Sequence, residues 1–101
     1  MNRVELQNLL EALLGSRNVY FQPPESVRMS YPAIVYSLNS IDHNAANNSK
    51  YLYHRSYTVT LIDKNPDSVF IDKLLALPFC RFDRHYVSDN LNHYTFSIYC
   101  N

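Results

Sequence analysis

Residues 59–94 read VTLIDKNPDSVFIDKLLALPFCRFDRHYVSDNLNHY, and this stretch decides the fold. Its start completes a strand over residues 53–61, in which apolar and polar side chains alternate with the two-residue period of a half-buried strand. Residues 63–68 form a turn, and a short apolar helix follows until Pro78 ends it. Residues 79–87 and 92–100 predict two more strands, joined by a hairpin turn over residues 88–91.

Strict alternation assigns the side chains of these elements to faces. The residues expected to share the inward faces of the last two strands are Cys80, Phe82, Tyr86, Tyr94, Phe96, Ile98 and Cys100. The residues expected on the opposite faces are Arg81, Asp83, His85, His93, Thr95, Ser97 and Tyr99. The helix before them is expected to bury a stripe of Phe70, Ile71, Leu74 and Leu75.

The N-terminal half adds a first helix and two extended segments. Asn2 is a typical N-cap, leucines recur at helical spacing, and Gly15 stands where a left-handed C-cap is needed. Residues 18–21 are extended, and residues 33–41 alternate as a strand. Residues 42–50 are polar and rich in asparagine, so we expect a long, mobile loop between two strands.

The order of elements predicts the fold class. One domain of 101 residues is expected to form an α+β fold, a mainly antiparallel sheet of four to five strands with two helices packed on one face. Nine basic residues balance nine acidic ones, so nothing in the net charge attracts nucleic acid or an anionic membrane, and self-association is tolerated. The chain has no apolar run of transmembrane length, and Glu5 and Gln7 interrupt any signal peptide, so we expect a protein used without export.

Catalytic chemistry finds little support in the sequence. Asp83, His85, Asp89 and His93 fall within eleven residues and are the best candidate metal ligands, but turn and surface roles explain them better. Cys80 and Cys100 lie on apolar strand faces, where a free thiol behaves as a small hydrophobe. A single glycine excludes a Gly-rich phosphate loop. We therefore expect no enzyme, no cofactor and no metal, with a small metal-dependent enzyme using Asp83, His85 and His93 as the alternative.

A basic and aromatic cluster near the C-terminus is a candidate nucleic-acid surface. Arg81, Arg84 and His85 alternate with Phe82 and Tyr86, as on platforms that bind single strands. Asp83 interrupts the cluster, and no wider basic patch surrounds it. A dedicated nucleic-acid-binding role is therefore not expected.

A series of short motifs, in order and over roughly four fifths of the chain, resembles the tail terminator proteins of long-tailed bacteriophages and prophages of Gram-positive bacteria. The motifs are Tyr20-Phe-Gln-Pro-Pro-Glu, Tyr31-Pro-Ala-Ile-Val-Tyr, Ile41-Asp, Tyr57-Thr-Val-Thr-Leu-Ile-Asp, Pro66-Asp-Ser, Asp72-Lys, Leu77-Pro, Phe82-Asp-Arg and Asp89-Asn-Leu-Asn-His. The resemblance implies a structural subunit that forms a ring, typically hexameric, on the head-proximal end of the tail tube. Such a ring ends tube polymerisation and offers a surface to the head connector.

The resemblance also implies partners and a location. The partners are further copies of the chain, the tail tube protein and the head–tail connector protein, and the location is the virion, after assembly in the host bacterial cytoplasm. A head–tail joining or tail completion subunit is the alternative within the same class. Because unpaired strand edges and long loops readily form contacts between copies, we expect the interface at Asp42, His43, Asn44, Asn47, Asn48, Lys50, Tyr51, Arg81 and Arg84.

Overall fold

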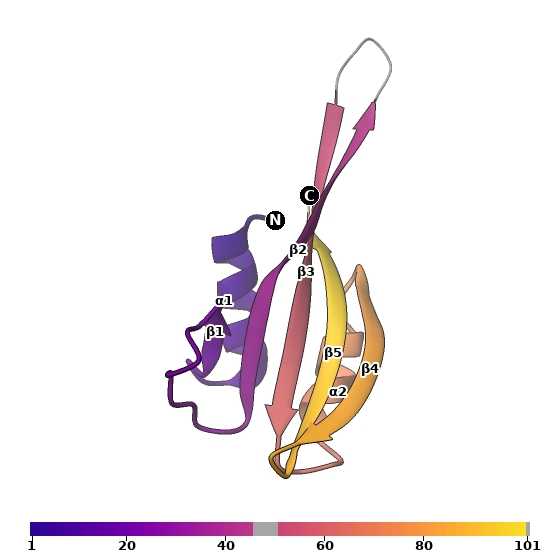
Figure 1. Cartoon of the computed structure of the whole chain (residues 1–101). Coiled ribbons are helices and arrows are strands. Elements are labelled where there is room, and N and C mark those ends of the chain that lie inside the picture. Colours follow the sequence, from indigo (N-terminus) through magenta and orange to yellow (C-terminus); the bar gives the residue numbers. More distant parts are fainter. Residues whose placement is uncertain (46–50, 101) are drawn as a thin grey trace.

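The computed structural model describes residues 1–45 and 51–100, with side chains described outside residues 42–53. The elements are α1 (Arg3–Leu14), β1 (Val19–Phe21), β2 (Ala33–Ala45), β3 (Tyr51–Asp63), α2 (Val69–Leu75), β4 (Cys80–Ser88) and β5 (Leu91–Cys100). The strands form one five-stranded sheet in the order β1-β2-β3-β5-β4, parallel only between β1 and β2 (Figure 1). The predicted α+β class, with a mainly antiparallel sheet and two helices, is confirmed.

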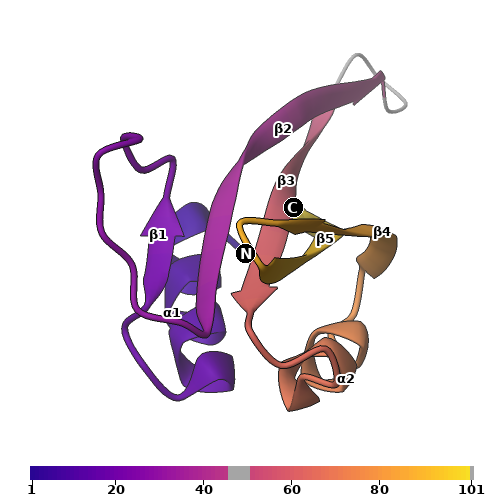
Figure 2. The same cartoon turned by 60° about the horizontal axis from the view of Figure 1, so that its bottom comes forward.

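Both helices cover the same face of the sheet, which we call the helix face (Figure 2). Side chains on this face line up across the strands in rows, because neighbouring strands pair in register. One row consists of Val19, Ile34, Leu61, Tyr94 and His85, and the next consists of Phe21, Tyr36, Val59, Phe96 and Phe82. The opposite face, which we call the outer face, carries short hydroxyl side chains at Thr58, Thr60, Thr95 and Ser97.

Helix α1 begins and ends as its sequence predicts. The Asn2 side chain accepts a hydrogen bond from the Glu5 backbone N–H at 2.8 Å, and Gly15 closes the helix with φ 75°. Leu6, Leu10 and Leu14 are buried against the sheet. A polar contact fixes the helix further, since the Tyr36 hydroxyl donates to Gln7 Oε1 and Gln7 Nε2 donates to the Val19 carbonyl at 3.0 Å. Burial raises the pKa of the Tyr36 hydroxyl, so it remains a donor at neutral pH.

Helix α2 covers the other half of the helix face less completely. Its N-cap is Ser68, and it ends at Leu75, three residues before Pro78. Of the predicted apolar stripe, Leu74 is fully buried and Phe70 and Ile71 are half-buried, while Leu75 is 46% exposed. At about 100° per residue, the four positions of the stripe span about 140° of the helix circumference, so Leu75 lies at the margin of the covered side.

The β2–β3 hairpin is longer than its sequence suggests. Pairing continues from Ile41 opposite Arg55 to Ala45 opposite Tyr51, beyond the last pair of β3 with β5 at Arg55 and Cys100. The two strands therefore project from the body as a two-stranded arm (Figure 1). The expected loop over residues 42–50 is wrong for Asp42, His43 and Asn44, which lie in β2. Once a hairpin is in register, backbone pairing extends through residues of low strand propensity.

The β4–β5 hairpin has the predicted turn but not the predicted faces. Asp89 and Asn90 adopt φ values of 54° and 62°, as in a two-residue type I′ turn. The register shifts between Phe82, opposite Phe96, and Arg84, opposite Thr95, so Asp83 is an extra residue in a β-bulge. Beyond the bulge, His85 pairs with Tyr94 and lies on the helix face, and Tyr86 pairs with His93 on the outer face. The predicted faces of His85 and Tyr86 are therefore wrong, because one inserted residue reverses the alternation.

Candidate functional site

The predicted interface residues separate into two groups at opposite edges of the sheet. Asp42, His43 and Asn44 lie in β2, and Tyr51 lies in β3, so these four belong to the arm. Arg81 and Arg84 lie in β4, which β5 and β3 separate from β2. Asn47, Asn48 and Lys50 lie outside the described residues. The described members of the predicted interface set therefore lie on two separate parts of the sheet.

Strand β4 is a free edge of the sheet. It pairs with β5, and the residues from Arg81 to Ser88 are all exposed. Nine residues is long for an unpaired edge, which presents a row of backbone donors and acceptors to any extended chain that approaches. The bulge at Asp83 bends the strand and so limits unspecific pairing of this edge with other extended chains.

Side chains from neighbouring strands hold the bulge in place. The Ser97 hydroxyl donates to Asp83 Oδ2 at 2.6 Å, and the Thr95 hydroxyl donates to the Arg84 carbonyl at 3.1 Å. Arg81 Nε lies 3.4 Å from Asp83 Oδ1. The reversal of faces is thus a fixed feature of the strand, since the extra residue has partners of its own.

The opposite edge of the sheet is partly free as well. Strand β1 pairs with β2 at Ile34, Val35 and Tyr36, and the Gln22 side chain accepts from the Leu38 backbone N–H at 3.3 Å. Among the described strands, none pairs with this edge of β2 beyond that point. The molecule therefore has two free edges, on different strands and with different neighbours.

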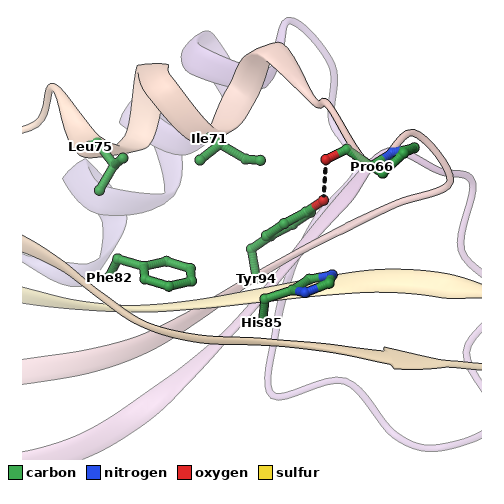
Figure 3. A pocket seen from close by; sticks show the side chains of 6 residues that line it. All are labelled: Pro66, Ile71, Leu75, Phe82, His85 and Tyr94. Atoms are coloured by element: carbon green, nitrogen blue, oxygen red, sulfur yellow. Dashed lines mark hydrogen bonds between the residues drawn. The ribbon is translucent and has the colours of Figure 1, made fainter.

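A cavity lies between α2 and the β4–β5 hairpin, and we call it the socket (Figure 3). Its volume is about 440 Å³, and its lining consists of Pro66, Ile71, Leu75, Phe82, His85 and Tyr94. Figure 3 shows Ile71 and Leu75 pointing down from the helix toward the rings of Phe82 and Tyr94 on the sheet. The cavity exists because α2 is short and leaves the ends of two rows of the helix face uncovered.

Two polar groups of the socket already have hydrogen-bond partners. The Tyr94 hydroxyl donates to the Pro66 carbonyl at 2.7 Å, and His85 Nε2 lies 3.0 Å from Asn92 Oδ1. The His85 ring stacks on Tyr94 with centroids 4.7 Å apart. Burial raises the pKa of the Tyr94 hydroxyl, so the group stays neutral. The surface left for a ligand is therefore mainly hydrocarbon.

The candidate metal ligands do not converge. The bulge places His85 on the helix face, whereas the Asp83 carboxylate accepts from Ser97 and His93 stacks on Tyr86 at 4.7 Å. Asp89 lies in the hairpin turn. Among the described residues, no three His, Cys, Asp or Glu side chains are grouped closely enough to hold a metal ion. The expectation that Asp83 and His85 share one strand face is wrong.

The two cysteines are free thiols in apolar surroundings. Cys80 pairs with Ile98, so it is not opposite Cys100. Burial, together with the nearby Asp83 carboxylate, raises the pKa of the Cys80 thiol to about 11. Burial also raises the pKa of the Cys100 thiol. A thiol with a raised pKa is a poor nucleophile at neutral pH.

The basic and aromatic cluster is divided between the two faces. Phe82 and His85 line the socket, while the Arg84 guanidinium lies 4.9 Å from the centre of the Tyr86 ring on the outer face. Arg81 is paired with Asp83. These side chains therefore do not form one continuous platform for bases.

Sequence reasoning did not find the socket or the apolar groups around it. Phe82 and Leu75 lie on the cavity wall and are 42% and 46% exposed, and Phe79, outside the lining, is 72% exposed. The signal was present as the segment 77–82, whose side chains are apolar except for Arg81, but strict alternation assigned Phe82 to a covered core. The bulge in β4 and the short helix α2 together leave the socket open.

No protein-family model matches the chain, and no curated protein matches it. Neither described helix has both the length and the hydrophobicity needed to cross a bilayer. The two free edges and the socket are therefore the features from which a function has to be argued.

Proposed function

We propose that this protein is a structural subunit of a bacteriophage virion that acts by binding alone and forms a ring. The observation that carries the proposal is the pair of unlike free edges, β2 with its arm on one side of the sheet and β4 with the socket on the other. When one surface of a subunit binds a different surface of the next, the contacts propagate in one direction and close into a ring if the rotation permits.

The place of the ring follows from the resemblance in the sequence. The ordered motifs from Tyr20 to His93 resemble tail terminator proteins, a resemblance that implies a small α+β fold of sheet and helices, and the chain has a fold of this class. We infer a ring, with six copies as the expected number, on the head-proximal end of the tail tube. There it ends polymerisation of the tube protein and provides the surface on which the head–tail connector attaches. Assembly takes place in the host bacterial cytoplasm, and no catalytic step, cofactor, membrane or dedicated nucleic-acid contact is required.

Electron microscopy of lysates from the parent phage with this gene inactivated tests the proposal. Overlong tubes without heads are expected, because growth of the tube loses its stop. Tails of normal length lying beside filled heads would instead assign the protein to the head–tail joining step. Intact virions would contradict a virion role altogether.

A deletion in the arm tests the ring more directly. Removing residues 44–49 shortens the arm but leaves the rows of the helix face intact. The expected result is a folded monomer that no longer completes tails, with unchanged circular dichroism and thermal melting. An unfolded deletion protein would show that the arm serves stability, contrary to the proposal.

A further inference from the structure

The helix face has exposed apolar side chains at both of its ends. Leu38 and Ile41 of β2 are 41% and 42% exposed, because they lie beyond the part of the face that α1 covers. They share the helix face since Leu38 pairs with Tyr57 and Ile41 pairs with Arg55, which in turn pairs with Cys100. A bulge at Asn39 allows this three-residue spacing. At the other end of the same face lies the open socket.

We propose that the socket receives the side chains of Leu38 and Ile41 from a second copy of the chain, whose β2 edge pairs with β4. This inference rests on the proposed ring and names the contact that builds it. Added strands use backbone hydrogen bonds for affinity and side-chain pockets for specificity. The free edge of β4 supplies the first, and the socket supplies the second.

Strand direction and facing both agree with this occupant. In the order β1-β2-β3-β5-β4, the antiparallel pairs make β2 run opposite to β4. A second copy that continues the sheet past β4 therefore brings its β2 in antiparallel, with its helix face on the same side. Leu38 and Ile41 of that copy then project toward the side on which Phe82 and His85 line the socket.

The two edges are offset along the strands, and a ring accommodates this offset. Leu38 is level with Cys80 across the sheet, so the free part of β2 begins near the end of β4. Neighbouring copies must therefore be displaced along the strand direction to overlap. A closed circle of strands requires such a stagger together with a tilt of the strands to the axis.

The chemistry of the socket matches aliphatic side chains. Its wall is formed by Ile71, Leu75 and the rings of Phe82 and Tyr94. The Tyr94 hydroxyl and His85 Nε2 are already hydrogen-bonded, so a polar or charged guest finds little compensation for losing water. Burying two aliphatic side chains removes apolar surface from water on both partners.

A peptide titration tests the socket independently of any ring. The probe is a synthetic peptide of residues 36–44, added to the isotope-labelled protein while NMR shifts are followed. We expect shifts at Ile71, Leu75, Phe82 and His85, with a Kd on the order of 1 mM, as for a weak single-segment contact. The same peptide with serine at positions 38 and 41 is the control and should bind at least about tenfold more weakly. Absence of shifts at several millimolar peptide, or equal binding of the control, would overturn the proposal.

Variants of the full chain test the contact between copies. Leu75→Glu places a charge on the socket wall, and Val69→Glu is its matched control, since Val69 is an exposed α2 residue outside the lining. Ile41→Glu removes the guest, and Tyr99→Glu is a control at similar exposure on the outer face. In sedimentation velocity, Leu75→Glu and Ile41→Glu should remain monomeric at concentrations where the parent chain and both controls associate.

Mixing the two defective variants gives a sharper result. Ile41→Glu copies retain an intact socket, and Leu75→Glu copies retain Leu38 and Ile41. An equimolar mixture should therefore form dimers and stop there, because each pair has one functional contact. If Leu75→Glu alone associates normally, the proposed role of the socket is contradicted, while the proposal of a ring is unaffected. If the peptide binds at the socket but virions are normal after gene inactivation, the socket contact is supported and the proposed virion ring is contradicted.

Discussion

Helices α1 and α2 cover two halves of one sheet face, and they differ in how completely they do so. Helix α1 has 12 residues, buries three leucines and is held by the Gln7 contacts to Tyr36 and Val19. Helix α2 has 7 residues, buries Leu74 and leaves the socket between itself and β4. The first half resembles a closed core, and the second retains accessible apolar surface. Packing of α1 can therefore supply most of the stability, while α2 leaves apolar surface available for binding.

Truncation of one leucine in each half should give the largest difference. Leu10→Ala removes a fully buried side chain and is expected to lower the free energy of unfolding by about 2–5 kcal/mol. Leu75→Ala, at a half-exposed position, should cost less than about 1 kcal/mol. Urea unfolding of both variants measures the two values. Equal losses would show that α2 is as closely packed as α1.

The Cys80 thiol tests whether water penetrates beneath the β4 end of the looser half. With its pKa raised from 9.0 to about 11, the thiol should react about 100-fold more slowly with iodoacetamide at pH 8 in the folded protein than in urea. The Cys100→Ala background isolates the Cys80 signal. Equal rates would mean that the strand end is open to solvent.

The raised pKa of the Cys80 thiol also predicts how the free energy of unfolding depends on pH. The folded state disfavours the thiolate, so the unfolded chain loses its proton first, and stability should be unaffected below about pH 9. It should then fall as the pH rises from about 9 through about 11. Replacing Cys80 by alanine should reduce this slope, while the raised pKa values of Tyr36, Tyr94 and Cys100 sustain the remainder.

The C-cap of α1 tests the better-packed half without touching its core. Gly15 has φ 75°, and a Cβ built there meets nothing within 4 Å, so Gly15→Ala should cost only backbone strain of about 1–2 kcal/mol. Gly15→Asn should cost less, because asparagine tolerates the left-handed region. Thermal melting of the two variants provides the comparison. Loss of more than the strain energy would indicate that the cap also positions β1.

Removal of a single hydroxyl in each half should give the smallest effects. Tyr36→Phe removes the bond to Gln7, and Tyr94→Phe removes the bond to the Pro66 carbonyl. Each is expected to cost about 0.5–1.5 kcal/mol in chemical denaturation. Tyr94→Phe should also change the NMR shifts of Ile71 and Leu75, since Pro66 shares the socket wall with them. Unchanged shifts would mean that the turn holds the socket without this bond.

Local chemistry made much of this fold predictable from the sequence. Asn2 and Gly15 marked the ends of α1, and the residues Ser88 to Leu91 marked a hairpin, because caps and turns depend on a few neighbouring residues. Tyr94, Phe96, Ile98 and Cys100 of β5 also share one core, as their alternate spacing predicts. In each case the information needed lay within one element.

The errors arose where pairing with distant residues decides the outcome. The length of the arm depends on register between β2 and β3, which the polar composition of Asp42 to Asn44 concealed. The faces of His85 and Tyr86 depend on the bulge, which Ser97 and Thr95 stabilise from the next strand. The socket depends on both the bulge and the length of α2. No window of local sequence contains that combination.

The bulge at Asp83 also has a consequence for insertions and deletions. Successive side chains of a strand lie on opposite faces of the sheet. One extra residue therefore reverses the faces that strict alternation predicts for all residues from the bulge to the turn. Loss of Asp83 would restore strict alternation with Arg84, His85 and Tyr86 on their present faces, whereas loss of Arg84 with the bulge retained would place Tyr86 in the wall of the socket. The bulge at Asn39 likewise determines the face of Ile41, which lies on the same face as Leu38. Single-residue length changes in β2 and β4 would thus act as discrete switches of the surface, whereas substitutions tune it by degrees.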